Sequence, residues 1–160
     1  MAILAAYKSG LKFKKIIDIL HRIKPVEGRL EKIGKLKNNS RVILDYAHTP
    51  DALKSAFLNL KEHFPNNNIN LVFGCGGERD FKKRIMMGKI AEKYSNEIYL
   101  TDDNPRSENP SKIRKDIKKG IKKSKIYEIS NRKKAIEEAI KNLNTGDLLL
   151  VAGRGHEKVQ

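Results

Sequence analysis

The chain has 160 residues, which predicts one compact domain, and its 39% hydrophobic content beside 33% charged residues argues against a disordered protein. Its single cysteine, Cys75, excludes an intrachain disulfide and a cysteine-based metal cluster. No apolar stretch approaches the roughly 18 residues that span a bilayer, and the first residues lack the pattern of a signal peptide, so we expect a cytoplasmic protein without a membrane segment.

The first third of the chain contains signals for a helix, two strands and a second helix. Isoleucine and leucine recur at helical spacing over residues 16–23, and Pro25 ends that pattern. Residues 29–36 are typical of a first strand or hairpin arm, and the turn signal KNNS separates them from a β-rich run at 41–47. Thr49, followed by a proline and an acid, then predicts the capped start of a helix.

The same alternation of strand and helix continues to the end of the chain. Continuous apolar runs predict strands at 69–74, 97–101, 125–130 and 147–152. Amphipathic patterns predict helices at 85–94, from about 109–110 onward, and around 135–143. This alternation is typical of an α/β fold, with a Rossmann-like, mostly parallel sheet covered by helices on both faces. Ligands of such sheets bind at the carboxyl ends of the strands, so we examine the loops that follow them.

Four of these loops are rich in glycine or polar residues: DYAHTPD (45–51), GCGGERD (74–80), TDDNPRSENP (101–110) and VAGRGHE (151–157). The glycines at 74, 76 and 77 permit close approach of a ligand, but they match neither a phosphate-binding P-loop nor the dinucleotide signature, and a plain turn is an equal alternative. Arg79 and Asp80 favour a functional loop because charges at the tip of a buried strand need partners. We interpret Cys75 as a small buried residue rather than a nucleophile.

The last of these loops presents Arg154, His156 and Glu157 between glycines, although a solvent-exposed glycine turn explains the pattern as well. His48, His156, Asp45 and Glu157 lack the spacing of known metal-ligand motifs, so we expect no metal site in this chain.

Read together and in this order, VEGRLE, DYAHTPDAL, VFGCGGERD, TDDNPRSENP and VAGRGHE resemble the C-terminal domain of the Mur ligases, in particular the members that add meso-diaminopimelate. The resemblance runs from Pro25 to Gln160. It implies that residues 1–24 are similar to the helical end of the family's central ATPase domain, and that 25–160 form the amino-acid-binding domain, apparently truncated at its C-terminal end.

The resemblance also implies an activity. The family ligates an amino acid to a UDP-MurNAc-peptide with ATP and Mg²⁺, and here the substrates would be ATP, meso-diaminopimelate and UDP-MurNAc-L-Ala-D-Glu, used in cytoplasmic peptidoglycan synthesis. The phosphate loop, the magnesium ligands and a carbamylated lysine belong to the family's central domain, so we expect no catalytic residue in this chain, a dependence on the missing ligase domains, and no turnover by the chain alone.

Individual positions follow from the same resemblance. On the nucleotide side, Arg29 resembles a phosphate-contacting arginine, and Asp45 and His48 resemble contacts to ATP. For meso-diaminopimelate, the matching residues are Arg79, Asp103, Asn104, Arg106, Gly153 and Glu157. A fixed cation for the distal carboxylate and a fixed anion for the distal ammonium suit a zwitterionic end group, and the prolines beside Asn104 and Arg106 stiffen their loop, which lowers the cost of ordering it.

Two departures from the family pattern are Ile85, where a proline is common, and Arg154, where a lysine is usual; neither removes a residue named above. The alternatives left open are the lysine-adding relatives, against which Arg106 argues, and a non-catalytic module that binds diaminopimelate or a muropeptide. A net charge of +15 raises a third alternative, nucleic-acid binding. The lysines, however, are spread over nearly every helix, including the one predicted around Ile113 and Ile117, without interleaved aromatic residues, so we expect no specific nucleic-acid partner.

Overall fold

We describe the chain from a computed structural model, which describes residues 2–22, 26–78 and 80–154. These residues form one six-stranded sheet in the order β1-β2-β6-β3-β4-β5. The strands are β1 (Glu31–Lys35), β2 (Arg41–Asp45), β3 (Ile69–Phe73), β4 (Glu97–Leu100), β5 (Lys125–Glu128) and β6 (Leu148–Ala152). The edge strand β1 is antiparallel to β2, whereas the other neighbours are parallel. The predicted α/β class and mostly parallel sheet are therefore confirmed.

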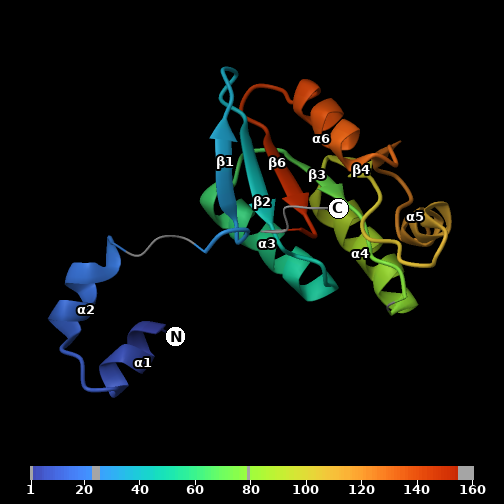
Figure 1. The fold of residues 1–160 in the computed structure, drawn as a ribbon. Helices are drawn as coiled ribbons and strands as arrows, with labels where there is room; N and C mark the ends of the chain where they lie inside the picture. Colours follow the sequence, from blue (N-terminus) through green and yellow to red (C-terminus); the bar gives the residue numbers. More distant parts are fainter. Residues whose placement is uncertain (1, 23–25, 79, 155–160) are drawn as a thin grey trace.

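Helices cover both faces of this sheet. The helices of the described chain are α1 (Ala2–Lys8), α2 (Phe13–Leu20), α3 (Pro50–His63), α4 (Phe81–Tyr94), α5 (Pro110–Lys118) and α6 (Arg132–Lys141). Alternate strand residues point to opposite faces, and one core contains Phe57 of α3, Met87 of α4 and Ile117 of α5. The opposite core contains Ala135 and Ala139 of α6. Figure 1 shows this arrangement, with α3 and α4 on one side of the strands and α6 on the other.

The order of the strands brings the carboxyl ends of four of them together. The chain moves outward from β3 through β4 to β5, and then returns through α6 to place β6 on the opposite side of β3. All five residues of β3 and of β6 are buried, as expected for central strands of a parallel sheet. The carboxyl ends of β2, β6, β3 and β4 are consequently neighbours along one edge, and the winding reverses where β6 meets β3.

Side-chain caps explain where three helices begin. The hydroxyl of Thr49 accepts a hydrogen bond from the Ala52 amide, and Pro50 occupies the first turn of α3, as predicted. Asn109 caps α5 in the same way. Helix α4 begins at Phe81, four residues earlier than Ile85, because Asp80 accepts from the Lys82 amide and acts as its N-cap. Asp80 therefore has a structural role as the N-cap of α4.

The two N-terminal helices lie away from the sheet (Figure 1). Helix α2 ends at Leu20, short of the predicted end near residue 23, and Ile23 and Pro25 lie outside the described residues. Helix α1 was not predicted, because its seven residues are too short to show a periodic pattern. Several large apolar side chains of this pair are exposed, including Leu4 at 54% and Phe13 at 56%. In the described parts of the chain, no helix is long and apolar enough to cross a membrane.

Candidate functional site

The loops that follow β2, β6, β3 and β4 form one continuous strip along the carboxyl edge of the sheet. The Gly153 amide, after β6, donates to the carbonyl of Asp45 at the end of β2 over 3.0 Å. The Thr101 amide, after β4, donates to the carbonyl of Phe73 over 3.0 Å. The residues predicted for the nucleotide and for the amino acid are therefore joined directly through the backbone.

The loops after β3 and β4 are in backbone contact that requires glycine. The Gly77 amide donates to the Asn104 carbonyl over 2.8 Å. A Cβ atom at Gly77 would lie 1.9 Å from the carbonyl oxygen of Pro105, and one at Gly74 would lie 2.4 Å from that of Thr101. Because both distances are far below van der Waals contact, only glycine permits the two loops to lie so close together.

Arg106 and Asn104 are held in place within this contact. The Nη1 atom of Arg106 donates to the Gly77 carbonyl over 2.5 Å. Its amide donates to Oδ1 of Asn104 over 3.2 Å, and its backbone has a φ of 51°, in the left-handed region. A non-glycine residue adopts that conformation only where its surroundings impose it. The guanidinium predicted to hold a carboxylate is therefore oriented before any ligand arrives.

Asp103 lies beside Gly153, as expected if both belong to one site. A Cβ atom at Gly153 would lie 3.4 Å from Oδ2 of Asp103, and the φ of 101° at Gly153 favours glycine. Oδ1 of Asp103 accepts from Nε of Arg154 over 3.1 Å, an ion pair that joins the loops after β4 and β6. Arg154, where the family pattern has a lysine, thus positions Asp103.

Two residues predicted for the nucleotide, Arg29 and His48, both contact the ring of Tyr46. The guanidinium carbon of Arg29 is 5.1 Å from the centroid of the Tyr46 ring. The rings of Tyr46 and His48 meet edge to face at 4.7 Å, and Nδ1 of His48 is 3.0 Å from the Tyr46 carbonyl oxygen. Tyr46 was not predicted as a site residue, although it stands within the quoted DYAHTPD motif.

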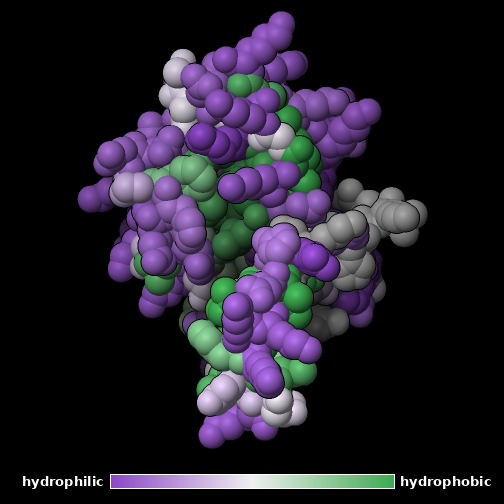
Figure 2. Space-filling view, turned by 90° about the vertical axis from the view of Figure 1, so that its left-hand side faces the viewer, coloured by the Kyte–Doolittle hydropathy of each residue, from purple (hydrophilic) through white to green (hydrophobic). Residues whose placement is uncertain are grey.

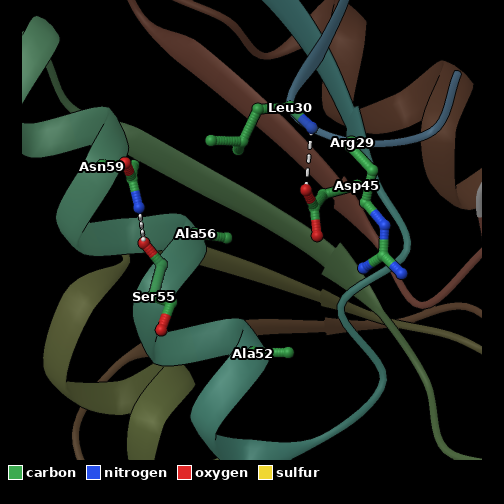
Figure 3. A pocket seen from close by; sticks show the side chains of 7 residues that line it. All are labelled: Arg29, Leu30, Asp45, Ala52, Ser55, Ala56 and Asn59. Carbon is green, nitrogen blue, oxygen red and sulfur yellow. Dashed lines mark hydrogen bonds between the residues drawn. The ribbon is translucent and has the colours of Figure 1, made fainter. Parts of the chain in front are cut away.

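Asp45 borders a pocket of about 290 Å³ between β2 and α3. Figure 3 shows the Asp45 carboxylate and the Arg29 guanidinium on one side of this pocket, facing Ala52 and Ser55 on α3. The carboxylate oxygens accept from the amides of Leu30 and Ala47, both over 2.8 Å. A carboxylate has about four acceptor positions, so it retains capacity to accept from a ligand hydroxyl as well.

A second hollow continues along the same side of the molecule. A cavity of about 190 Å³ lies between β1 and α3, next to the first pocket, with which it shares Leu30 and Asn59. Figure 2 shows an apolar hollow on this side, surrounded by hydrophilic side chains. The open wall beside β2 thus contrasts with the close-packed loops at the other end of the strip.

Two predicted residues of the amino-acid site, Arg79 and Glu157, lie outside the described residues, as does His156. Cys75 is buried as predicted, and burial raises its thiol pKa to about 12, which keeps the thiol protonated and unreactive. Within residues 2–22, 26–78 and 80–154, no group of three His, Cys, Asp or Glu side chains converges as metal ligands would.

Three arginines beneath the strip were not predicted from the sequence. Arg84 of α4 is 1% exposed and pairs with Glu108 and with Asp116 of α5. Arg114 of α5 pairs with Asp102, next to Asp103. The Nη2 atom of Arg132 donates to the Ala152 carbonyl over 2.8 Å, just before Gly153. The spacing of Arg84 from Met87, Gly88 and Ala91, which places it on the buried face of α4, is the signal that could have found it.

Comparison with known proteins identifies the family of the chain. The family model described as "Mur ligase, glutamate ligase domain" matches residues 28–155. The chain belongs to the Mur ligase family. A curated relative from Rickettsia felis, named UDP-N-acetylmuramoyl-L-alanyl-D-glutamate--2,6-diaminopimelate ligase, is 47% identical over the whole chain, which covers 30% of that protein. A relative of the same name from Wigglesworthia glossinidia brevipalpis is 46% identical over the whole chain and 32% of its own length.

A solved structure supports the same family. A structure titled as a UDP-N-acetylmuramoyl-L-alanyl-D-glutamate--2,6-diaminopimelate ligase has a TM-score of 0.76 and 37% identity over 99% of this chain and 32% of its own. The chain spans about a third of the length of the curated relatives it matches.

Proposed function

We propose that this Mur ligase chain is the amino-acid-binding part of an ATP-dependent ligase that adds meso-diaminopimelate to UDP-MurNAc-L-Ala-D-Glu in the cytoplasm. The proposal rests on the strip of loops that follow β2, β6, β3 and β4 along the carboxyl edge of the sheet. Asp103, Asn104, Arg106 and Gly153 gather at one end of it, and the bond between the Gly153 amide and the Asp45 carbonyl joins them to the nucleotide side.

The amino-acid end of the strip suits a zwitterionic group. Arg106, oriented by the Gly77 carbonyl, offers a fixed guanidinium for the distal carboxylate of diaminopimelate, with the Asn104 side chain beside it. Arg79 would add a second cation, and Glu157, with the Gly153 carbonyl, would receive the distal ammonium. L-lysine lacks the distal carboxylate and would leave Arg106 without its partner, which is why polar sites discriminate strongly.

The nucleotide end suits the sugar and phosphates of ATP. Arg29 is placed to reach phosphate oxygens, for which guanidinium geometry is well matched. Asp45 faces the pocket and keeps acceptor positions for ribose hydroxyls, with His48 nearby. In this position the chain forms one wall of an ATP site that the ATP-binding part of a whole ligase would complete, and Mg²⁺ would be held there rather than by this chain.

The reaction proceeds through an acyl phosphate. The side-chain carboxylate of the D-glutamate residue attacks the γ-phosphorus of ATP and releases ADP. The diaminopimelate amine then attacks the acyl carbon, the new C–N bond forms as phosphate leaves, and the amine loses its proton. This chain's contribution is to hold the distal end of diaminopimelate, so that its reacting amine lies near the acyl carbon.

The test is a pair of NMR titrations of the labelled chain, one with meso-diaminopimelate and one with L-lysine. We expect amide shifts in the loops that carry Arg106 and Gly153 with meso-diaminopimelate alone. An Arg106→Gln variant, which removes the cation and keeps the length, should lose those shifts. Shifts with L-lysine of equal size would favour the lysine-adding class instead, and no shifts in a well-dispersed spectrum would contradict the proposal for this chain.

Two further measurements separate the other classes of function. Phosphate release by the chain alone, with ATP and both substrates, would show that it carries catalysis, whereas we expect none. Duplex DNA should bind only weakly and lose its affinity steeply with added salt, because a net charge of +15 spread over the surface acts through counterion release.

A further inference from the structure

Two glutamates brace the loops after β3 and β4 in a reciprocal way. The carboxylate of Glu108, on the second loop, accepts from the amide of Glu78 on the first loop. The carboxylate of Glu78 accepts in return from the amide of Ser107 over 3.2 Å and from its hydroxyl. Each loop therefore supplies a carboxylate to a backbone N–H of the other. We name this arrangement the glutamate clasp: Glu78, Ser107 and Glu108.

The clasp is anchored to the body of the domain through Arg84. Its guanidinium makes two hydrogen bonds to Glu108, over 2.7 and 3.0 Å, and a third to Asp116 of α5 over 3.3 Å. The side chain of Glu108 is 16% exposed and that of Arg84 is 1% exposed. Bidentate pairing of an arginine with a carboxylate fixes both partners in orientation as well as in distance. The rigid helix α4 thereby sets the position of Glu108, and Glu108 sets that of the loops.

The clasp adjoins residues of the proposed amino-acid site. Asn104 and Arg106 lie just before Ser107, and the left-handed backbone at Glu78, with a φ of 52°, matches the φ of 51° at Arg106. Two such conformations on facing loops need a surrounding structure that imposes them. The carboxylates supply it by accepting from the amide of Glu78, which is one of the two positions, and from the amide of Ser107, which follows the other.

We propose that the glutamate clasp, held by Arg84, is the positioning device for the diaminopimelate carboxylate site: it keeps Arg106 and the adjoining loop in the binding geometry. Glu78, Glu108 and Arg84 are positioning residues, since their contacts are to the loops and to one another. This inference rests on the proposed function for the identity of the ligand, whereas the clasp itself is measurable without any ligand.

The test begins with Glu78→Ala, because Glu78 is exposed and its removal leaves the core intact. In the ligand-free chain, solvent exchange of the Ser107 amide should accelerate roughly tenfold, since it loses its acceptor. The affinity for meso-diaminopimelate should fall roughly tenfold, because the loop must then be ordered on binding. ADP affinity should not change, and this selectivity separates positioning from general damage to the fold.

Three further variants complete the design. Glu78→Gln keeps an acceptor oxygen in the same place, so it should restore most of the lost affinity and of the Ser107 protection. Glu62→Ala on α3 removes the same charge from an exposed position far from the loops in sequence, and it should alter neither quantity. Glu108→Ala gives the reciprocal result, with faster exchange of the Glu78 amide.

The outcomes are distinguishable from those of the proposed function. If the unsubstituted chain binds meso-diaminopimelate and Glu78→Ala binds it equally well, the clasp proposal is overturned and the proposed function stands. If the unsubstituted chain does not bind, the proposed function fails, and the exchange rates alone decide whether the clasp orders the loops. Unchanged exchange at Ser107 in Glu78→Ala overturns the clasp in either case.

Discussion

The two ends of the strip are built in different ways. The amino-acid end, after β6, β3 and β4, is closed by backbone hydrogen bonds, by glycine contacts and by ion pairs. The nucleotide end, after β2, presents Arg29 and His48 on one aromatic ring beside an open pocket of about 290 Å³. The difference indicates that the end proposed to bind the amino acid is preorganised, whereas the end proposed to bind the nucleotide offers one open wall.

The largest expected effect comes from forcing the amino-acid loops apart. Gly77→Ala places a Cβ atom 1.9 Å from the Pro105 carbonyl oxygen, so one of the two loops must move. Overpacking of this kind costs about 1–3 kcal/mol of unfolding free energy, and we expect binding of meso-diaminopimelate to be lost with it. Urea unfolding measures the first quantity and NMR titration the second.

Gly34→Ala is the matched control for that change. Gly34 lies in β1, opposite Val42 of β2, and no atom lies within 4 Å of the position that its Cβ would take. The stability should therefore change by less than about 1 kcal/mol. If both alanines destabilised the protein equally, the contrast in packing between the two ends would be wrong.

A double titration tests whether the two ends bind different ligands. Arg106→Gln should weaken meso-diaminopimelate by roughly tenfold or more, because the distal carboxylate loses a charge-assisted hydrogen bond, and should leave ADP binding unchanged. Arg29→Gln should do the reverse, with a smaller effect on a more exposed site. A variant that weakened both ligands alike would contradict the division of the strip into two halves.

The same contrast marks what the sequence could and could not predict. Strand positions and the helix start at Thr49 followed from apolar runs and from capping chemistry, which are local signals. The Gly77 contact with Pro105 and the pairing of Arg84 with Glu108 depend on loops that meet only after the sheet has formed. The start of α4 was predicted four residues too late, at Ile85, because the N-cap hydrogen bond of Asp80 was not recognised in the sequence.

Acid should loosen the clasp and thereby the amino-acid end. Hydrogen bonds from Ser107 hold the pKa of Glu78 below its ordinary value of 4.5, and those from Arg84 do the same for Glu108. Because both values are depressed in the folded protein, the stabilisation is present above pH 4.5 and is lost as the pH falls through the lowered values. Protection of the Ser107 amide, corrected for intrinsic exchange, should therefore be constant from about pH 7 to 5 and fall below that range. Protection that declined already between pH 7 and 6 would point to a different titrating group.

The smallest expected effect concerns the ring under Arg29. Tyr46→Leu removes the aromatic face that holds the guanidinium at 5.1 Å, and a cation–π contact at an exposed site contributes about 0.5–1 kcal/mol. ADP affinity should fall about two- to fivefold by NMR titration, while meso-diaminopimelate affinity stays the same. Tyr46→Phe keeps the ring and should retain the affinity. Equal loss in both variants would assign the effect to the hydroxyl group, and the nucleotide wall would then be ordered by hydrogen bonding rather than by stacking.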